Sequence, residues 1–236
     1  MKIKYIVLLF SFSITIISCG TIFGNKNIIT DERNLSFFDK IEISGSAEVI
    51  FHSSAEYRAV VTVDSNLSEY LETTVRNGVL IIRERPGYDC VFTKETVDVY
   101  CPNITDISLS GSGRFDTIDK IRASKISINV SGSGKISGNV ECNNILIDIS
   151  GSGSINIAGK TENADVKISG SGNLKGTEFS ITNCSVNLSG SGKADIFVNE
   201  NLDVRISGSG NITYSGNPQT NINSSGSGKV TKRNPV

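Results

Sequence analysis

The sequence predicts an all-β chain folded as a parallel β-solenoid, and three observations support this fold class. Ser-Gly-Ser-Gly occurs seven times, starting at residues 110, 131, 150, 169, 189, 207 and 225. The steps between copies are 18 to 21 residues, the length of one solenoid coil. Apolar and polar residues alternate on both sides of the motif, as in half-buried strands. Because each repeat can bury its apolar side only against a neighbour, we expect the copies to stack.

The first segment, residues 1–18, has the features of an export signal peptide. Two lysines precede an apolar run from Tyr5 to Ile17, and small residues follow it. This run is too short for a stable membrane span. The stretch Ile16-Ile17-Ser18-Cys19 also resembles a bacterial lipobox, which implies cleavage before Cys19 and lipid attachment to its thiol. The alternative is an ordinary signal peptide that happens to contain a cysteine.

Residues 19–33 are predicted to form a flexible, lipid-anchored tether, because glycine and asparagine recur in this stretch. Residues 34–102 are predicted to form the N-terminal coils and a cap. A weaker copy of the motif at 41–51, with Ala47 in place of the second glycine, marks the start of the solenoid. The segment after it is rich in large side chains, and Arg76-Asn77-Gly78 predicts a turn. A cap is expected here because an open β edge invites pairing with other chains.

Residues 103–232 are predicted to form the regular part of the solenoid. In one repeat Ile147, Ile149 and Ile155 occupy alternate positions, so their side chains are expected to point inward. The same parity places both motif glycines, such as Gly151 and Gly153, inward, where the coil wall could pinch or turn. The serines are then expected to face outward in ladders.

Four cysteines follow Cys19. Cys90 and Cys101 flank a stretch with a plausible turn, so a hairpin disulfide between them is possible in an oxidising compartment, and two separate thiols are the alternative. Cys184 shares the inward parity of its neighbours, and Cys142 is expected at a corner. These two lie about two coils apart, so we expect small packed hydrophobes and no bridge.

The chain offers little recognisable chemistry. Without the two lysines of the signal, 21 basic and 24 acidic residues leave a formal charge of −3. No basic stripe with interleaved aromatics is present, so a nucleic-acid partner is not expected. No aspartate follows the glycine motifs, which argues against a calcium-binding β-roll, and no metal or cofactor is predicted. The single histidine, His52, has no triad partner by spacing and is expected to be exposed at a strand end. Coils of constant length leave no room for the loops that build a lyase groove, so no enzyme activity is predicted.

The chain resembles a known family, the putative auto-transporter adhesins with a head GIN domain. The residues that carry the resemblance are Phe38–Val49, Val63–Leu67, Asn77–Ile82, Val99–Pro102 and Ile107–Gly113. The resemblance covers about residues 38–230, and it implies a right-handed β-helix on the bacterial surface or in the periplasm, with a role in adhesion. It brings no catalytic or ligand-binding residues.

Taken together, these features predict a non-enzymatic cell-envelope lipoprotein, anchored in the outer membrane through Cys19, that acts as an adhesin or as a binding or scaffolding module. Its expected partners are the membrane, through the lipid, and a protein or glycan on a host or neighbouring cell. The alternatives are a glycan-binding or polysaccharide-degrading β-helix and a purely structural envelope protein.

Overall fold

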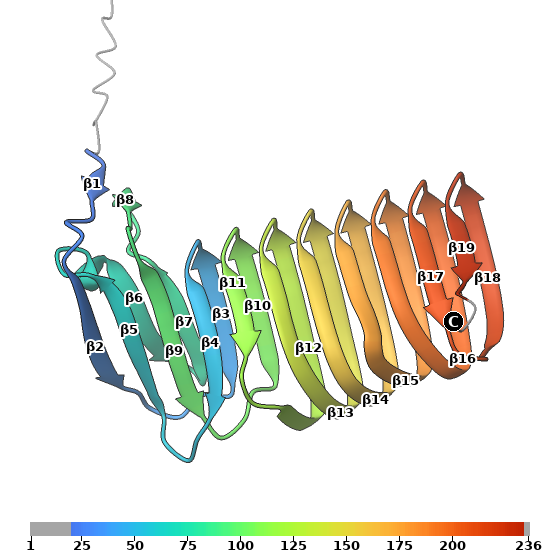
Figure 1. The fold of residues 1–236 in the computed structure, drawn as a ribbon, viewed down its shortest axis with the longest axis horizontal. Coiled ribbons are helices and arrows are strands. Elements are labelled where there is room, and N and C mark those ends of the chain that lie inside the picture. Colours follow the sequence, from blue (N-terminus) through green and yellow to red (C-terminus); the bar gives the residue numbers. More distant parts are fainter. Residues whose placement is uncertain (1–19, 234–236) are drawn as a thin grey trace, which may run out of the picture.

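The computed structural model describes residues 20–233. Apart from one short 3-10 helix, η1 (Ser68–Tyr70), its regular elements are β-strands. Parallel coils of about 19 residues stack into a β-solenoid of about seven turns, as Figure 1 shows. This confirms the fold class predicted from the repeat period.

The regular part of the solenoid is a stack of long strands that each run through most of one coil. In β13, Ile147 lies between Ile128 of the coil before and Val166 of the coil after. Ile147 and Ile149 are at most 1% exposed, which confirms that the alternating apolar residues form the core. These strands are β12 (Ile121–Gly132), β13 (Lys135–Gly151), β14 (Ser154–Gly170), β15 (Asn173–Gly190) and β16 (Lys193–Gly208).

Shorter strands extend this stack at both ends. The weak motif copy near Ile41 forms a true coil, because β3 pairs with β10 and β4 pairs with β11, both in parallel. The prediction that the solenoid begins there is confirmed. The strands concerned are β3 (Lys40–Gly45), β4 (Glu48–Ser53), β10 (Asp106–Gly111) and β11 (Arg114–Thr117) at the first end, and β17 (Asn211–Ser215), β18 (Gln219–Gly226) and β19 (Lys229–Lys232) at the other.

The first end of the rod is covered by strands that are partly antiparallel. Here β7 pairs with β3 and β9 pairs with β4, while β5 lies antiparallel to both β9 and β2. Strands β6 and β7 form a hairpin in which Asn77 and Gly78 both have positive φ, 51° and 77°. This is the turn predicted from the sequence, of the type that Asn-Gly favours. The bounds are β2 (Ile28–Asn34), β5 (Arg58–Asp64), β6 (Leu71–Arg76), β7 (Val79–Glu84) and β9 (Glu95–Cys101).

The structure corrects the prediction of a tether at residues 19–33. Residues 28–34 form β2, which pairs with β5 along its whole length, and β1 (Ile22–Phe23) pairs with β8 (Cys90–Val91). The fully buried carboxylate of Asp64 accepts hydrogen bonds from the backbone N–H groups of Lys26 (2.8 Å) and Thr93 (2.7 Å). A Cβ on Gly24 would lie 2.4 Å from that carboxylate, so this glycine makes room for a buried polar contact and is not a linker residue.

The two glycines of each motif play different roles, which corrects the prediction that both point inward. The first glycine is at least partly exposed and turns the chain; Gly151 has φ +113°, a conformation that favours glycine. The second is buried in every copy but the last, and a Cβ on Gly153 would lie 2.4 Å from Val130. The motif serines are exposed or partly exposed, as predicted. A single residue with positive φ therefore leaves the buried row at the first glycine, while Ile149 before it and Gly153 after it keep the same alternation.

Candidate functional site

Cys19, the predicted lipid attachment point, lies outside the described residues, so its modification stays a prediction. The hairpin disulfide between Cys90 and Cys101 is not present, because no hairpin joins them. Cys90 lies in β8, before β9, whereas Cys101 is the last residue of β9, a strand that spans roughly 20 Å. A disulfide requires Cα atoms within about 7 Å.

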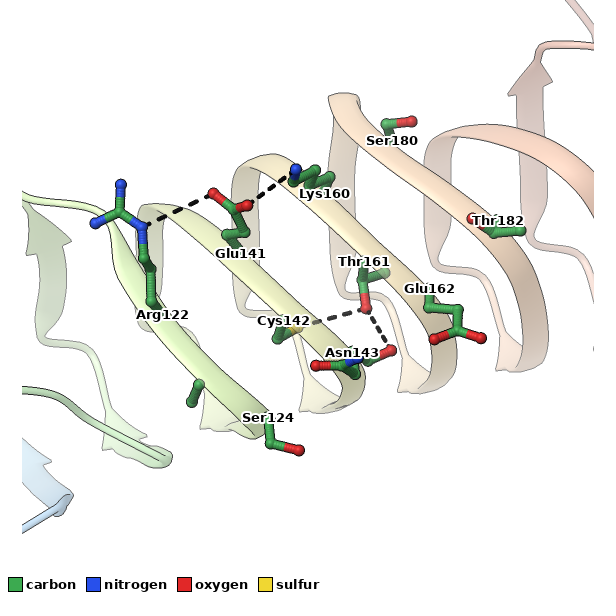
Figure 2. A pocket seen from close by; sticks show the side chains of 11 residues that line it. Arg122, Ser124, Glu141, Cys142, Asn143, Lys160, Thr161, Glu162, Ser180 and Thr182 are labelled. Carbon is green, nitrogen blue, oxygen red and sulfur yellow. Dashed lines mark hydrogen bonds and ion pairs between the residues drawn. The ribbon is translucent and has the colours of Figure 1, made fainter.

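In the described part of the chain, a groove with a volume of about 690 Å³ lies at the corner of the coils. We call it the corner groove. It crosses four coils, at the point where each long strand bends, and Figure 2 shows its polar side chains. At a coil spacing of about 4.8 Å, four coils give a groove roughly 14 Å long. It is lined by Arg122, Ala123, Ser124, Glu141, Cys142, Asn143, Lys160, Thr161, Glu162, Ser180 and Thr182.

A row of alternating charge runs along one wall of the corner groove. The backbone register pairs Arg122 with Glu141, Glu141 with Lys160, and Lys160 with Ser180. The Glu141 carboxylate lies 2.9 Å from Nζ of Lys160 and 3.3 Å from Nζ of Lys120. Hydrogen bonds from Lys160 and Lys120 hold the pKa of Glu141 below its ordinary value. Glu141 is therefore a carboxylate at neutral pH, unsuited to act as a general acid.

The floor of the corner groove is neutral. The hydroxyl of Thr161, which is only 5% exposed, lies 3.1 Å from the carbonyl oxygen of Asn143 and 3.2 Å from that of Asn163. The Cys142 thiol lies 3.4 Å from the Thr161 oxygen, and burial raises the pKa of this thiol. Because a thiolate is the reactive form of cysteine, Cys142 is a poor nucleophile at neutral pH.

A ladder of asparagines lies beside the corner groove, one residue past the bend. Side-chain amides bond from coil to coil: Asn163 to Asn144 at 3.2 Å, Asn183 to Asn163 at 3.1 Å and Asn201 to Asn183 at 2.7 Å. We call this set the asparagine ladder. These hydrogen bonds join the side chains of neighbouring coils along the rod.

His52 lies near the end of β4, as predicted, but it is half-buried and not exposed. Its Nε2 lies 2.8 Å from Oδ1 of Asp98. Its ring stacks on Tyr100, with centroids 4.6 Å apart, and the guanidinium of Arg58 lies 3.7 Å from the Tyr100 ring centroid. Within residues 20–233 no hydroxyl lies at hydrogen-bond distance from His52, so the pair does not extend to a catalytic triad.

Residues 20–233 contain no group of three or more His, Cys, Asp or Glu side chains that could hold a metal ion. No helix in that range is long and apolar enough to cross a membrane.

The corner groove was not predicted from the sequence, although its residues follow a regular pattern. Arg122, Glu141 and Lys160 recur at steps of 19 residues, the period of the glycine motif. The asparagine ladder recurs at steps of 18 to 20 residues. Aligning the repeats and comparing every position, not only the glycine motif, would have shown that these residues lie in one row.

The chain is therefore a parallel β-solenoid repeat protein with a polar groove, the corner groove, along its described coils. The family model "Putative auto-transporter adhesin, head GIN domain" matches residues 37–218, and the chain belongs to this family. Membership supports an adhesin-like, non-enzymatic binding role and a place at the cell surface or in the envelope.

Solved structures show the same fold. A putative adhesin from Bacteroides fragilis has a TM-score of 0.86 at 19% identity, covering 90% of this chain and 100% of its own. A putative adhesin from Parabacteroides merdae has a TM-score of 0.75 at 23% identity, covering 91% and 99%. A putative lipid binding protein from Parabacteroides distasonis has a TM-score of 0.77 at 27% identity, covering 91% and 100%. No curated protein matches the chain.

Proposed function

We propose that this chain is a non-enzymatic outer-membrane lipoprotein of adhesin type, held by acyl chains on Cys19, that binds a surface protein or glycan through the corner groove. The observation that carries the proposal is the groove itself, in which polar side chains from four successive coils form one continuous surface. A row of contacts at regular spacing suits an extended polar partner, because each coil adds one similar weak contact.

The chemistry of the corner groove favours binding over catalysis. Glu141 is held as a carboxylate by Lys160 and Lys120, and Cys142 is held as a thiol by burial. Near neutral pH, Glu141 therefore has no proton to donate, and Cys142 is not in its nucleophilic thiolate form. The exposed ammonium and guanidinium groups of Lys160 and Arg122 can instead donate hydrogen bonds to a partner.

The relatives and the amino terminus add support. Two structural neighbours are named as putative adhesins and one as a putative lipid binding protein. The lipobox-like stretch ending at Cys19 favours attachment to a membrane. A polysaccharide-degrading protein and a purely structural rod remain the alternatives, and the experiments below separate them.

Binding is tested with the purified protein on immobilised matrix proteins and glycans. We expect Lys160→Ala to weaken binding about fivefold, the effect of roughly 1 kcal/mol. The matched control is Lys167→Ala, because Lys167 also lies in β14, is similarly exposed and also forms an ion pair. Equal losses in the two variants would refute a role for the groove. If the wild type binds none of these surfaces, only the structural alternative stands.

Two other readouts test the remaining parts of the proposal. The mature protein should partition into detergent, and Cys19→Ala should remain in the aqueous phase, because acyl chains contribute about 0.8 kcal/mol per buried methylene. Incubation with uronate, glucan or peptidoglycan polymers should release no products, with or without calcium. Turnover of one of these polymers that is lost on changing one side chain would establish the enzymatic alternative.

A further inference from the structure

Each regular coil is a flattened loop with two distinct ends. The Ser-Gly-Ser-Gly turns line one long edge of the rod, and the bends that form the corner groove line the other (Figure 1). We call these the turn edge and the groove edge. Along β13, for example, the chain leaves the turn edge at Lys135, bends at Asn143 and returns at Gly151.

The N-terminal end of the described chain lies at the turn edge. Strands β1 and β8 stand at the side of the rod where the long strands β12 to β16 end (Figure 1). Contacts agree with this position: the Ser46 hydroxyl donates to Glu95 at 2.9 Å, and a Cβ on Gly45 would lie 3.6 Å from Glu84. Strand β8 lies between Glu84 and Glu95 in the chain.

Large apolar side chains are exposed at this point. Phe23 in β1 is 67% exposed, and its cross-strand partner Val91 in β8 is 48% exposed. Tyr88, two residues before β8, is 45% exposed. Phe23 is four residues after Cys19, so a lipid on Cys19 would be attached within about 14 Å of this apolar pair.

A basic row runs along the same edge. The residues that follow the seven Ser-Gly-Ser-Gly motifs are in register from coil to coil, and they carry four cations and no carboxylate. At the weaker first copy the same position is Glu48, which is in register with Arg114. All seven are exposed or partly exposed. By contrast, charges alternate in sign along the groove edge. The basic row consists of Arg114, Lys135, Ser154, Asn173, Lys193, Asn211 and Lys229.

We propose that the turn edge is a membrane-facing surface, on which Phe23 and Val91 enter the interface of an anionic bilayer and the basic row lies along its headgroups. Apolar side chains bind the interfacial region, and cations near it are attracted to anionic lipids. The rod then lies along the membrane with the corner groove facing away, open to a partner. The membrane-facing edge extends the proposal of a lipoprotein. It rests on that proposal only because a lipid on Cys19 would keep the apolar pair close to the bilayer.

The sequence contains no tryptophan, so single-tryptophan variants of the full chain report on their own position. Phe23→Trp probes the apolar pair, and Ser191→Trp probes the turn edge far from the anchor. Ile118→Trp is the control, because Ile118 is 69% exposed and lies past β11, away from the turn edge. The protein is reconstituted in vesicles of phosphatidylglycerol and phosphatidylcholine that contain lipids with nitroxide-labelled headgroups.

We expect quenching of Phe23→Trp and Ser191→Trp to be at least about threefold stronger than that of Ile118→Trp. For Ser191→Trp it should fall in high salt or in neutral vesicles, because screening weakens the attraction of the basic row. Quenching of Ser191→Trp no stronger than that of the control would overturn the proposal. Ser209→Trp, the equivalent position one coil further on, replaces Ser191→Trp if that variant does not fold.

Detergent partitioning of the same samples tests lipid attachment independently of the membrane-facing edge. A protein that partitions into detergent but shows equal quenching at all three positions keeps its anchor and refutes the membrane-facing edge. A protein that stays aqueous, yet shows the expected quenching pattern when vesicles are added, supports the edge and refutes the anchor.

Discussion

In the N-terminal cap, single side chains each connect several segments, whereas in the repeat coils one contact recurs in every layer. Asp64 accepts hydrogen bonds from segments near Lys26 and Thr93. Arg33 of β2 donates to the carbonyl oxygens of Ser68 (2.8 Å) and Leu71 (2.6 Å). In the coils, by contrast, each isoleucine layer repeats the one before it. The cap therefore depends on individual residues, and the coils depend on register.

The largest effect is expected from Asp64→Ala. The change removes the buried carboxylate that accepts hydrogen bonds from the backbone N–H groups of Lys26 and Thr93, so the free energy of unfolding should fall by about 2–4 kcal/mol. Urea denaturation measures this. Asp195→Ala is the control, because Asp195 is an exposed carboxylate on a coil, and its change should cost less than about 0.5 kcal/mol. Similar losses in both variants would remove the distinction between cap and coils.

The pH dependence of this effect has a defined sign. Burial of Asp64 favours its neutral form, but backbone hydrogen bonds led by Thr93 outweigh it and lower the pKa of the carboxyl. A lowered pKa stabilises the fold above the ordinary pKa, and this stabilisation is lost as the pH falls through the folded-state pKa. The difference between the wild type and Asp64→Ala should therefore shrink in acid.

Within the coils, the largest effect is expected at the first glycine of a motif. Gly170 has φ +111°, and a Cβ there would lie 2.7 Å from the carbonyl oxygen of Gly151. Gly170→Val should cost about 1–3 kcal/mol or more, against less than about 0.5 kcal/mol for Ser169→Ala beside it. Thermal melts compare the two. Equal shifts in melting temperature would mean that the turn tolerates a side chain and that the coils are not closely packed there.

A carboxyl where the cap meets the first coil should show the opposite pH behaviour to Asp64. Burial raises the pKa of Glu95 to about 7. The negative charge of Glu84 adds to this effect, and the hydrogen bond from Ser46 opposes it. A raised pKa stabilises the fold at low pH, and this stabilisation is lost as the pH rises through about 7. The free energy of unfolding of Glu95→Gln, measured relative to that of the wild type, should rise by about 1–2 kcal/mol between about pH 5 and pH 8. A constant difference across this range would show that Glu95 titrates normally.

Repetition explains which features could be predicted from the sequence. The layers around Ile147 were predictable because alternation and period agree in several copies. The groove residues Arg122, Glu141 and Lys160 follow the same period and could have been found in the same way. The inward direction of Gly151 was predicted wrongly, because this residue has positive φ and lies at the exposed turn, although the alternation of buried positions continues at Gly153 and Ile155. Alternation alone does not reveal such a local turn.

The non-repeated parts were harder to predict for a different reason. Gly24 sits in a stretch whose composition resembles a linker, and the partner that orders it, Asp64, lies 40 residues away with no shared pattern. The disulfide prediction failed similarly, because the run from Cys90 to Cys101 contains a straight strand, β9, and β8 pairs with β1 instead. Contacts made once leave no periodic trace in a single sequence.

The smallest structural effect is expected from removing one complete coil, residues 155–173. Because Ser154 is in register with Asn173 and Ile155 with Leu174, the new junction from Ser154 to Leu174 repeats a step already present in the coil. Circular dichroism should show a folded β protein with a small loss of stability, since coils contribute nearly independently. Deleting the β6–β7 hairpin is the contrasting control and should unfold the cap. The coil deletion also removes Lys160 and Thr161 from the corner groove, so partner binding should weaken without being lost. Unfolding of the coil deletion would contradict the view that stacking in register, and not any one residue, holds the coils together.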